Sequence, residues 1–183
     1  NDGSTDSSKT LLKSFTYIKL LKIRSRSGKG NAIKYGLNFA SNDKIILFDG
    51  DLELNTIELR KLMILDRNKD INYTLGSRFK KINPIESLWS FGNFIFILLF
   101  NFKFKSNITD ALCCAKSFYI KDIDKENLQS DNFDIDVEIT LKLIKKFKKS
   151  KIIPLSYSRR TIKAGKKIRI RDSWNIFKRI ISN

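Results

Sequence analysis

The chain reads Ile45-Ile46-Leu47-Phe48-Asp49-Gly50-Asp51-Leu52-Glu53 at the stretch that decides its fold. Four large apolar residues in a row are typical of a strand that is buried on both faces of a parallel sheet. The carboxylates that follow at once need a cationic partner if they are to leave bulk water. Because open α/β sheets bind ligands at the carboxyl ends of their strands, the stretch predicts a central strand that opens into a binding cleft.

The carboxylates of Asp49, Asp51 and Glu53 favour a divalent metal. Hard cations such as Mg²⁺ and Mn²⁺ prefer oxygen ligands, and a metal carrying a diphosphate would supply the positive charge that these groups need. A polar turn after a core strand would have the same pattern, since Asp-x-Asp is short and common. Both interpretations remain open on this stretch alone.

The flanking sequence alternates short apolar runs with helical patterns, which predicts an α/β fold with a mainly parallel sheet flanked by helices. Its length of 183 residues suits a single domain with a sizeable core. Strands are expected at 17–23, 45–48, 71–76, 111–120 and 152–157. Helices are expected from residue 4 or 5 to 14, after the glycine-rich turn 27–31 to about 40, at 56–66 and at 133–147. A final amphipathic helix is expected to be capped by Asp172.

Positive charge is concentrated near the C-terminus. Residues 141–183 carry 15 Lys and Arg against the single acid Asp172, whereas residues 1–140 carry 21 Lys and Arg against 18 Asp and Glu. This asymmetry predicts an anionic partner for the C-terminal part, such as phosphate, a membrane surface or nucleic acid. A lysine-rich composition alone would explain the number of cations but not their clustering.

The two cysteines, Cys113 and Cys114, are adjacent, and the chain has no histidine. Neighbouring cysteines rarely bridge each other because the geometry is strained. Without His or a CxxC pair a zinc site is not expected, and a reduced, cytoplasmic setting fits. No signal peptide is visible, and residues 1–6 form a turn without the strand that normally precedes it, so a fragment is expected.

An aromatic stretch occupies residues 84–104, with Trp89 and six phenylalanines at nearly every face of the expected helix. Such a helix is either buried in the core or lies at a membrane interface. The longest apolar run, 94–100, is far shorter than the ~20 residues of a membrane-spanning helix. Core packing and membrane contact both remain open.

Seven blocks stand in an order that resembles the inverting GT-A-fold glycosyltransferases related to dolichyl-phosphate mannose synthase and the bacterial polyprenyl-phosphate sugar synthases. They are residues 1–6 (NDGSTD), 28–32 (GKGNA), 49–53 (DGDLE), 76–79 (GSRF), Thr109-Asp110 with Cys114 and Lys116, 136–140 (DVEIT), and 157–161 (YSRRT) followed by 165–168 (GKKI). The resemblance covers nearly the whole chain. The family's first strand is absent, and residues 90–93 (SFGN), Lys163 and Ala164 depart from the family pattern.

The resemblance implies roles for individual residues. Nucleotide binding falls to Asp2, Lys29 and Asp49, and metal binding to Asp49, Asp51 and Glu53. The catalytic candidates are Asp51, Arg78 and Arg160, the phosphate or acceptor ligands Lys166 and Lys167, and possible bases Asp136 and Glu138. The domain would span 1–168, with a basic amphipathic tail at 169–183.

The resemblance also implies the chemistry. A GDP- or UDP-linked sugar would be the donor, Mg²⁺ or Mn²⁺ the cofactor, and a polyprenyl phosphate on an anionic membrane the acceptor, in cell-envelope synthesis on the cytoplasmic face. A lipid phosphate is already anionic and needs no strong base, so the lack of His is no obstacle. Three alternatives stay open. The first is transfer to a sugar hydroxyl, and the second is a basic nucleic-acid-binding protein, against which the carboxylate cluster argues. An inactive remnant with the same fold is the third.

Overall fold

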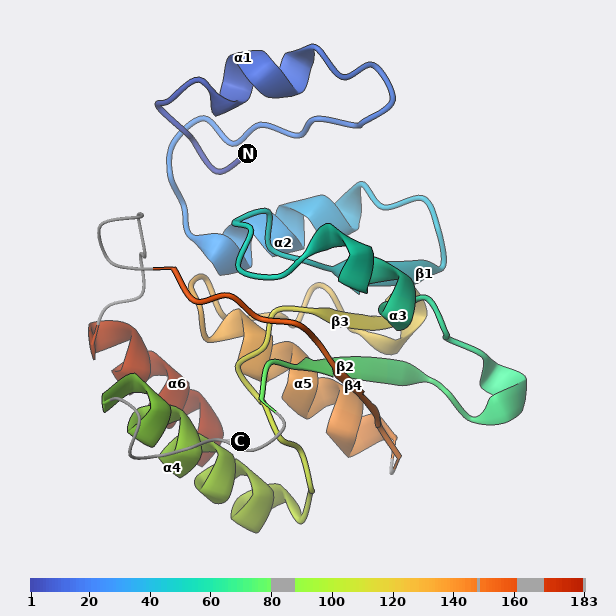
Figure 1. Ribbon diagram of the computed structural model, residues 1–183, viewed down its shortest axis with the longest axis vertical. Coiled ribbons are helices and arrows are strands. Elements are labelled where there is room, and N and C mark those ends of the chain that lie inside the picture. The colour runs from blue at the N-terminus through green and yellow to red at the C-terminus, as the bar shows by residue number, and fades with distance from the viewer. Residues whose placement is uncertain (80–87, 148, 161–169, 183) are drawn as a thin grey trace.

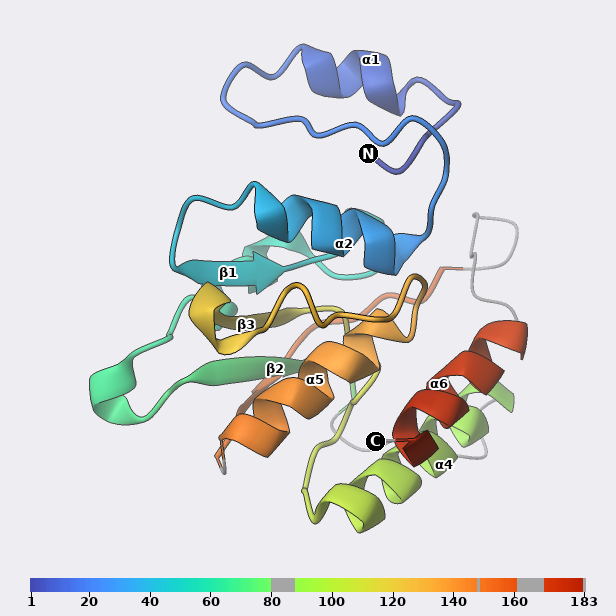
Figure 2. The ribbon, with the colours of Figure 1, turned by 180° about the vertical axis from the view of Figure 1, so that it is seen from behind.

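The computed structural model describes residues 1–79, 88–147, 149–160 and 170–182. A four-stranded sheet carries helices on both faces, with α2 and α5 on one face and α3 on the other (Figures 1 and 2). The strands are β1 (Lys44–Leu47), β2 (Tyr73–Ser77), β3 (Lys116–Tyr119) and β4 (Lys151–Pro154). The α-helices are α1 (Ser8–Lys13), α2 (Lys29–Asn38), α3 (Leu59–Leu62), α4 (Leu88–Phe104), α5 (Ile135–Lys146) and α6 (Ile170–Ser182). Short 3₁₀ turns lie at η1 (Thr56–Glu58), η2 (Arg67–Lys69) and η3 (Ile120–Asp122).

The strand order is β1-β3-β2-β4. Strand β3 is antiparallel to both β1 and β2, and β4 is parallel to β2. Three of the four described strands therefore run in one direction and β3 runs against them. The predicted α/β class is confirmed, as a single domain with a mixed sheet.

Two hydrophobic cores lie on opposite faces of this sheet. Because side chains alternate along a strand, Ile45 and Leu47 face one core while Ile46 and Phe48 face the other. The larger core holds the apolar side of α5 together with α2, α4 and α6. The smaller core holds Leu62 of α3, Ile153 of β4 and Leu155, which follows that strand. The sheet is thus covered on both sides, and the end of β1 lies between the two cores.

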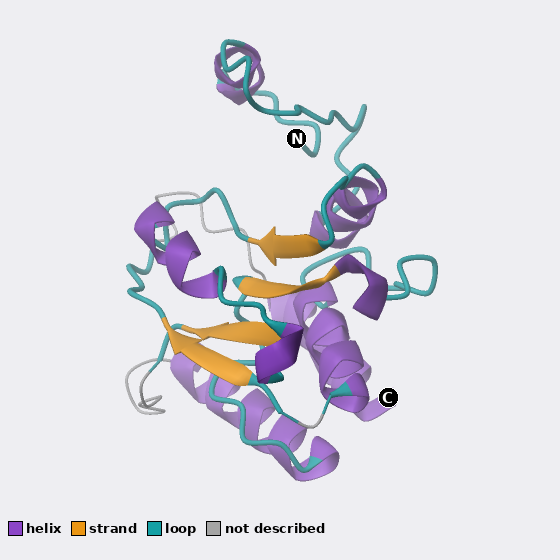
Figure 3. Cartoon of the chain, turned by 90° about the vertical axis from the view of Figure 1, so that its right-hand side faces the viewer, coloured by secondary structure: helices purple, strands orange, loops and turns teal. Residues whose placement is uncertain are grey.

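The prediction that residues 45–48 form a central strand is wrong, although their side chains do face a core on each side of the sheet. Strand β1 is an edge of the described sheet, and its apolar side chains are only half-buried. An edge strand has a neighbour on one side only, which leaves part of each side chain open to solvent. The strand predicted at 17–23 is reduced to one isolated bridge, between Asp2 and Ile23. Figure 3 shows this N-terminal segment and α1 standing away from the sheet, beyond α2.

Other elements are shorter than predicted. The helix predicted at 56–66 begins as a 3₁₀ turn, where the Asn55 side chain accepts from the Ile57 N–H, and ends at Leu62. The strand predicted at 111–120 covers only β3. Of the residues before it, Ala111 and Leu112 pack in the larger core and residues 113–115 in the smaller one. Helix α6 begins at Ile170, so Asp172 lies in its first turn and is not its cap.

The aromatic helix α4 contributes to the core and to the surface. Phe100 is fully buried, whereas Phe91, Leu98 and Phe102 are exposed, Phe102 to 89%. Helix α6 packs against both α4 and α5 and buries Ile176 and Ile180. Within the described residues, none of the helices has both the length and the hydrophobicity that crossing a membrane requires.

Candidate active site

A glycine-rich turn held by Asp2 forms one wall of the site. The Asp2 carboxylate accepts hydrogen bonds from the Ser27 N–H (2.8 Å), the Ser27 hydroxyl (3.0 Å) and the Gly28 N–H (3.0 Å). Gly28 has a φ of 100°, which a residue with a side chain rarely adopts. The first two predicted nucleotide-binding elements, the N-terminal block and the turn, are therefore brought together, and Lys29 starts α2 directly behind them.

Lys29 links two of the predicted carboxylates. Its Nζ lies 2.8 Å from Asp49 Oδ2, at the end of β1, and 2.8 Å from Asp136 Oδ2, in the first turn of α5. Asp136 also pairs with the fully buried Lys116 of β3, whose Nζ lies 3.3 Å from Oδ1 and 3.0 Å from the Asp136 carbonyl oxygen. A chain of alternating charges thus runs from β1 through α2 and α5 into the sheet.

Electrostatics stabilise the charged forms of Lys29 and Asp136, the two central members of this chain. Burial alone would lower the pKa of Lys29, but the adjacent Asp136 and Asp49 carboxylates outweigh it and raise the pKa. Burial would raise the pKa of Asp136, but Lys29 and Lys116 together hold it below its usual range. Asp136 is therefore a weak proton acceptor in this structure.

The second half of the site joins the loop after β1 to the segment after β4. Arg160 Nη2 lies 2.6 Å from Asp51 Oδ2, and the Arg160 N–H donates to Glu53 Oε1 (3.1 Å). The Tyr157 hydroxyl donates to Glu53 Oε2 (3.2 Å), and Tyr157 and Leu54 form an antiparallel bridge. The segment after β4 is thereby held against Asp51 and Glu53 of the predicted metal motif.

Two features of this half suggest that it can exchange partners. Arg160 Nε is buried and has no hydrogen-bond partner among the described residues, since the nearest Glu53 oxygen lies 3.8 Å away. Leu52, between the two aspartates and Glu53, has a φ of 64°, which is unfavourable for a branched side chain. Unpaired donors and strained backbone of this kind concentrate at functional sites.

The three predicted metal ligands face different partners. Asp49 pairs with Lys29, Asp51 with Arg160, and Glu53 with Tyr157 and the Arg160 backbone. The described ranges contain no group of three side chains placed to hold a metal ion. Asp49 and Asp51 still fit a metal that arrives with a diphosphate, because their side chains are 39% and 30% exposed and a substrate's oxygens can complete the coordination.

Arg78 is fixed by Asp110 through a fork of two hydrogen bonds. Its Nε lies 2.7 Å from Oδ2 and its Nη2 lies 2.8 Å from Oδ1, while the Arg78 N–H donates to the same carboxylate. The guanidinium also contacts the rings of Phe79 and Tyr157, with its carbon 5.3 Å and 5.5 Å from their centroids. Burial would lower the pKa of Arg78, but Asp110 raises it well above its ordinary value, so the guanidinium stays charged beside the Tyr157 segment.

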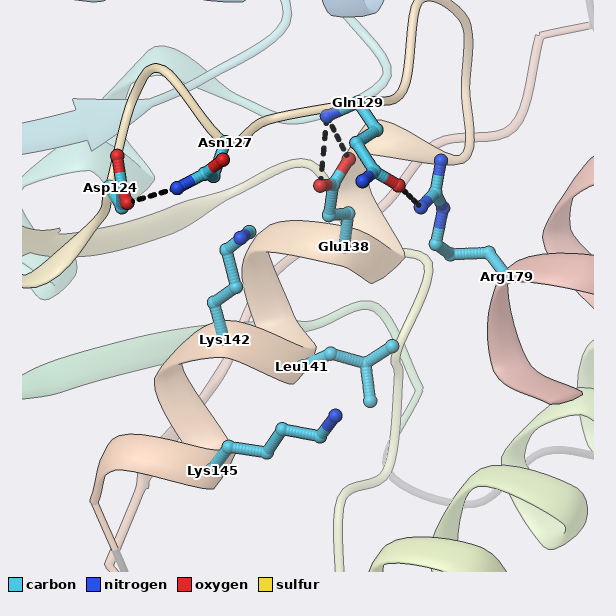
Figure 4. Close-up of a pocket in the computed structure, with 8 residues that line it drawn as sticks. All are labelled: Asp124, Asn127, Gln129, Glu138, Leu141, Lys142, Lys145 and Arg179. Atoms are coloured by element: carbon cyan, nitrogen blue, oxygen red, sulfur yellow. Dashed lines mark hydrogen bonds between the residues drawn. The ribbon is translucent and has the colours of Figure 1, made fainter. Parts of the chain in front are cut away.

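Glu138, the other predicted base, lies away from Lys29. Its carboxylate accepts from the N–H groups of Gln129 and Ser130 and borders a pocket of about 370 Å³ between α5, α6 and the loop before α5 (Figure 4). Burial would raise the pKa of Glu138, but the two backbone N–H donors hold it below its usual range. The structure thus separates the two candidate bases.

The structure therefore gathers Asp2, Lys29, Asp49 and Asp136 into one half of a site, and Asp51, Glu53 and Arg160 into the other. Lys163, Lys166 and Lys167 lie outside the described residues. Sequence reasoning quoted Asp110 and Lys116 without giving them a role. No local signal could have done so, because their partners Arg78 and Asp136 are 32 and 20 residues away.

Comparisons of the sequence and of the structure with known proteins point to the same family. The family model described as glycosyl transferase family 2 matches residues 1–128. A curated relative, the glycosyltransferase AglJ of Haloferax volcanii, is 25% identical over 158 residues, which cover 85% of this chain. This chain spans about half (51%) of the length of that relative.

Solved structures share the fold at low identity. Glucosyl-3-phosphoglycerate synthase from Mycobacterium tuberculosis, in complex with Mn²⁺ and UDP-glucose, has a TM-score of 0.72 and 11% identity, with 99% of this chain and 65% of that chain covered. The same enzyme in complex with phosphoglyceric acid has a TM-score of 0.67, with 11% identity over 99% of this chain and 66% of that one. These matches support the predicted GT-A fold.

Proposed function

Because this chain belongs to glycosyl transferase family 2, we propose that it transfers a sugar from a nucleotide-diphosphate sugar to a lipid phosphate, with inversion at the anomeric carbon. The observation that carries the proposal is the double pairing at the end of β1, where Asp49 holds Lys29 and Asp51 holds Arg160. Two neighbouring carboxylates, one of which can release its arginine, suit a diphosphate and its metal. Asp2 and the Ser27-Gly28 turn form the nucleotide side of the site.

Asp49 and Asp51 are the proposed ligands of Mg²⁺ or Mn²⁺. The similar fold of glucosyl-3-phosphoglycerate synthase, crystallised with Mn²⁺ and UDP-glucose, supports this assignment. When bound, the metal supplies positive charge to the leaving diphosphate without any proton transfer. Glu53 is not needed as a ligand, since its contacts to Tyr157 and Arg160 give it the role of holding the segment after β4.

In the proposed reaction, an oxygen of the acceptor phosphate attacks the anomeric carbon and forms the new glycosidic bond. The bond from that carbon to the donor diphosphate breaks, and its electron pair leaves with the nucleoside diphosphate. Arg160 releases Asp51 and turns to the diphosphate, where its contact strengthens as negative charge develops. Lys166 and Lys167 are proposed to contact phosphate from the same C-terminal segment.

An anionic acceptor is favoured because both candidate bases are poor ones. Two lysines hold the pKa of Asp136 low, and two backbone donors hold that of Glu138 low. A sugar hydroxyl would need a group that takes its proton, whereas a phosphate acceptor is already ionised at neutral pH. Arg78 is the proposed positioning group on the acceptor side.

The acceptor lipid places the protein on a membrane surface. Exposed apolar side chains of α4 and α6 supply the contact, namely Phe91, Leu98, Phe102, Trp174 and Ile181. Lys103 of α4 donates to the Ile181 carbonyl of α6, so the two helices are tied together. Each Lys or Arg near an anionic surface would add about 1 kcal/mol. We propose peripheral binding on the cytoplasmic face.

The direct test is transfer of a labelled sugar to polyprenyl phosphate in anionic liposomes. GDP- and UDP-sugars are supplied in turn with Mn²⁺, and the product is extracted into organic solvent. A lipid-linked sugar formed only with metal is expected. Product on a sugar hydroxyl or on 3-phosphoglycerate would contradict the lipid acceptor. Salt-sensitive RNA binding that ignores Mn²⁺ and nucleotide-sugars would favour the nucleic-acid alternative.

A further inference from the structure

The loop before α5 touches the glycine-rich turn through its backbone. The Asp131 carbonyl accepts from the Gly30 N–H (2.8 Å) and from the Asn31 N–H (3.3 Å). A Cβ at Gly30 would lie only 2.1 Å from the Ser130 carbonyl oxygen. Such a close approach leaves no room for the loop to shift toward the turn. Lys29 lies between Gly28 and Gly30, so its position depends on where the loop lies.

Glu138 fixes that loop from the opposite side. Its Oε2 accepts from the Ser130 N–H (2.8 Å) and its Oε1 from the Gln129 N–H (3.0 Å), as Figure 4 shows for Gln129. The Glu138 side chain and its hydrogen bond to the Ser130 N–H are buried, so removing the carboxylate would leave that backbone donor unsatisfied. On the other side of the pocket, Arg179 of α6 donates to Gln129 Oε1 (3.0 Å) and lies 3.5 Å from Asp134.

The geometry of α5 sends its two acids in different directions. Residues two apart on an α-helix are separated by ~200° around its axis. Asp136 accordingly reaches Lys29, whereas Glu138 reaches the loop. Both acids thus act on the same lysine, one by direct contact and the other through the loop and the turn.

We propose that Glu138 is a positioning residue that, together with Arg179, clamps residues 129–131 against the Gly28–Gly30 turn and so holds Lys29 at the donor site. The expected effect on nucleotide binding and turnover rests on the proposed function, whereas the contacts that form the clamp do not depend on it. It assigns Glu138 no proton transfer. It also ties α6, which carries the exposed Trp174 and Ile181, to the donor side of the site.

The test compares Glu138→Ala with Glu138→Gln in the full chain. Glutamine keeps an oxygen that can accept from the Ser130 and Gln129 N–H groups, whereas alanine leaves both unsatisfied. Hydrogen exchange at the Gly30 and Asn31 amides is expected to accelerate about tenfold or more in Glu138→Ala and less than about threefold in Glu138→Gln. UDP and GDP affinity with Mn²⁺ should fall in the same order, and kcat of Glu138→Gln should stay near wild type.

Lys142→Ala is the matched control, because Lys142 lines the same pocket without a hydrogen bond to the loop among the described residues. Arg179→Leu removes the other side of the clamp from a surface helix and should accelerate exchange moderately if Glu138→Ala does not fold. Unchanged exchange at Gly30 in Glu138→Ala would overturn the proposal. Loss of kcat in Glu138→Gln with exchange unchanged would make Glu138 a base. If the wild type binds neither nucleotide, the proposed function fails while the exchange data still decide the clamp.

Discussion

At the scale of single residues, the central feature is that basic side chains form ion pairs with the carboxylates at the end of β1. Lys29 is fixed by a second acid, Asp136, whereas the guanidinium of Arg160 has one close carboxylate and a buried Nε without a hydrogen-bond partner among the described residues. The two cations are therefore not equivalent. In the proposed reaction, Lys29 therefore stays in place, and Arg160 is the group that leaves Asp51 when a diphosphate binds.

Arg160→Ala should reduce turnover far more than donor affinity. If the contact of Arg160 strengthens as charge develops on the leaving group, kcat should fall about 100-fold while nucleotide affinity changes less than about fivefold. Steady-state kinetics and nucleotide titration in the presence of Mn²⁺ measure the two effects. Arg60→Ala, at an exposed position of α3, is the control. Equal losses in affinity and rate would make Arg160 an ordinary ground-state contact.

Asp136→Asn should destabilise the fold by about 3–5 kcal/mol at pH 7, because two lysines would lose their buried counter-charge. The folded pKa of Asp136 is lowered, so its stabilisation is present above the unfolded pKa and is lost as pH falls through the folded pKa. The folded pKa of Lys29 is raised, so its stabilisation is lost only as pH rises toward that pKa.

Urea unfolding between pH 3 and 9 measures this dependence. The difference between wild type and Asp136→Asn should be constant from about pH 5 to 9 and shrink below about pH 4. Asp43→Asn, at an exposed residue whose carboxylate is 4.0 Å from Lys121, should change stability by less than about 0.5 kcal/mol. A difference that grew toward acid pH would contradict the charge chain.

At the scale of elements, α2 depends on two glycines with opposite requirements. Gly30 has the Ser130 carbonyl 2.1 Å from the position of a Cβ, whereas Gly36 has open space there. Gly36→Ala should stabilise the protein by up to about 1 kcal/mol, since alanine favours a helix. Gly30→Ala should instead destabilise it by about 2 kcal/mol or more, because backbone would have to move.

Thermal or urea unfolding of the two variants provides a matched comparison within one helix. Gly30→Ala should also weaken nucleotide binding, because the turn that carries Lys29 would shift. Similar stability of the two variants would mean that the loop before α5 does not press on the turn.

The surface formed by α4 and α6 is the element that should contact the membrane. Phe102→Asp replaces a side chain that is 89% exposed, so it should leave stability within about 0.5 kcal/mol. Flotation with anionic liposomes should nevertheless recover much less of the variant than of the wild type. Leu11→Asp, on the distant α1, is the control for added negative charge. Equal flotation of Phe102→Asp and wild type would remove α4 from the membrane contact.

At the scale of the whole molecule, sequence patterns predicted the order of the elements along the chain better than they predicted which elements lie next to one another in space. The α/β class, the helices after residues 28 and 133, and the strand before Asp49 are confirmed, because hydrophobic periodicity is local. The edge position of β1 and the reversed direction of β3 were not predicted, since pairing joins residues such as Ile45 and Phe118 that are distant in sequence. The exposed side of α4 was left open for the same reason.

In the candidate site too, sequence patterns did not show which residues distant along the chain are in contact. Their position after an apolar strand made Asp49 and Asp51 candidates for the site. The partners of Lys29 could not be read from spacing, because Asp136 is 107 residues away. Glu138 was named with Asp136 as a possible base for a hydroxyl acceptor, and in the structure its carboxylate accepts from the loop before α5. Residue type identified the charged groups, and only the fold showed which of them meet.

The central claim is tested most directly by Mn²⁺-dependent nucleotide binding to wild type and Asp51→Asn, measured by calorimetry with UDP and with GDP. The wild type should bind one of the two nucleotides with metal and about tenfold or more weakly without it. Asp51→Asn should lose this metal dependence while unfolding like the wild type, since Asp51 is partly exposed. Nucleotide affinity that is unchanged in Asp51→Asn, or that ignores Mn²⁺ in both proteins, would contradict the account.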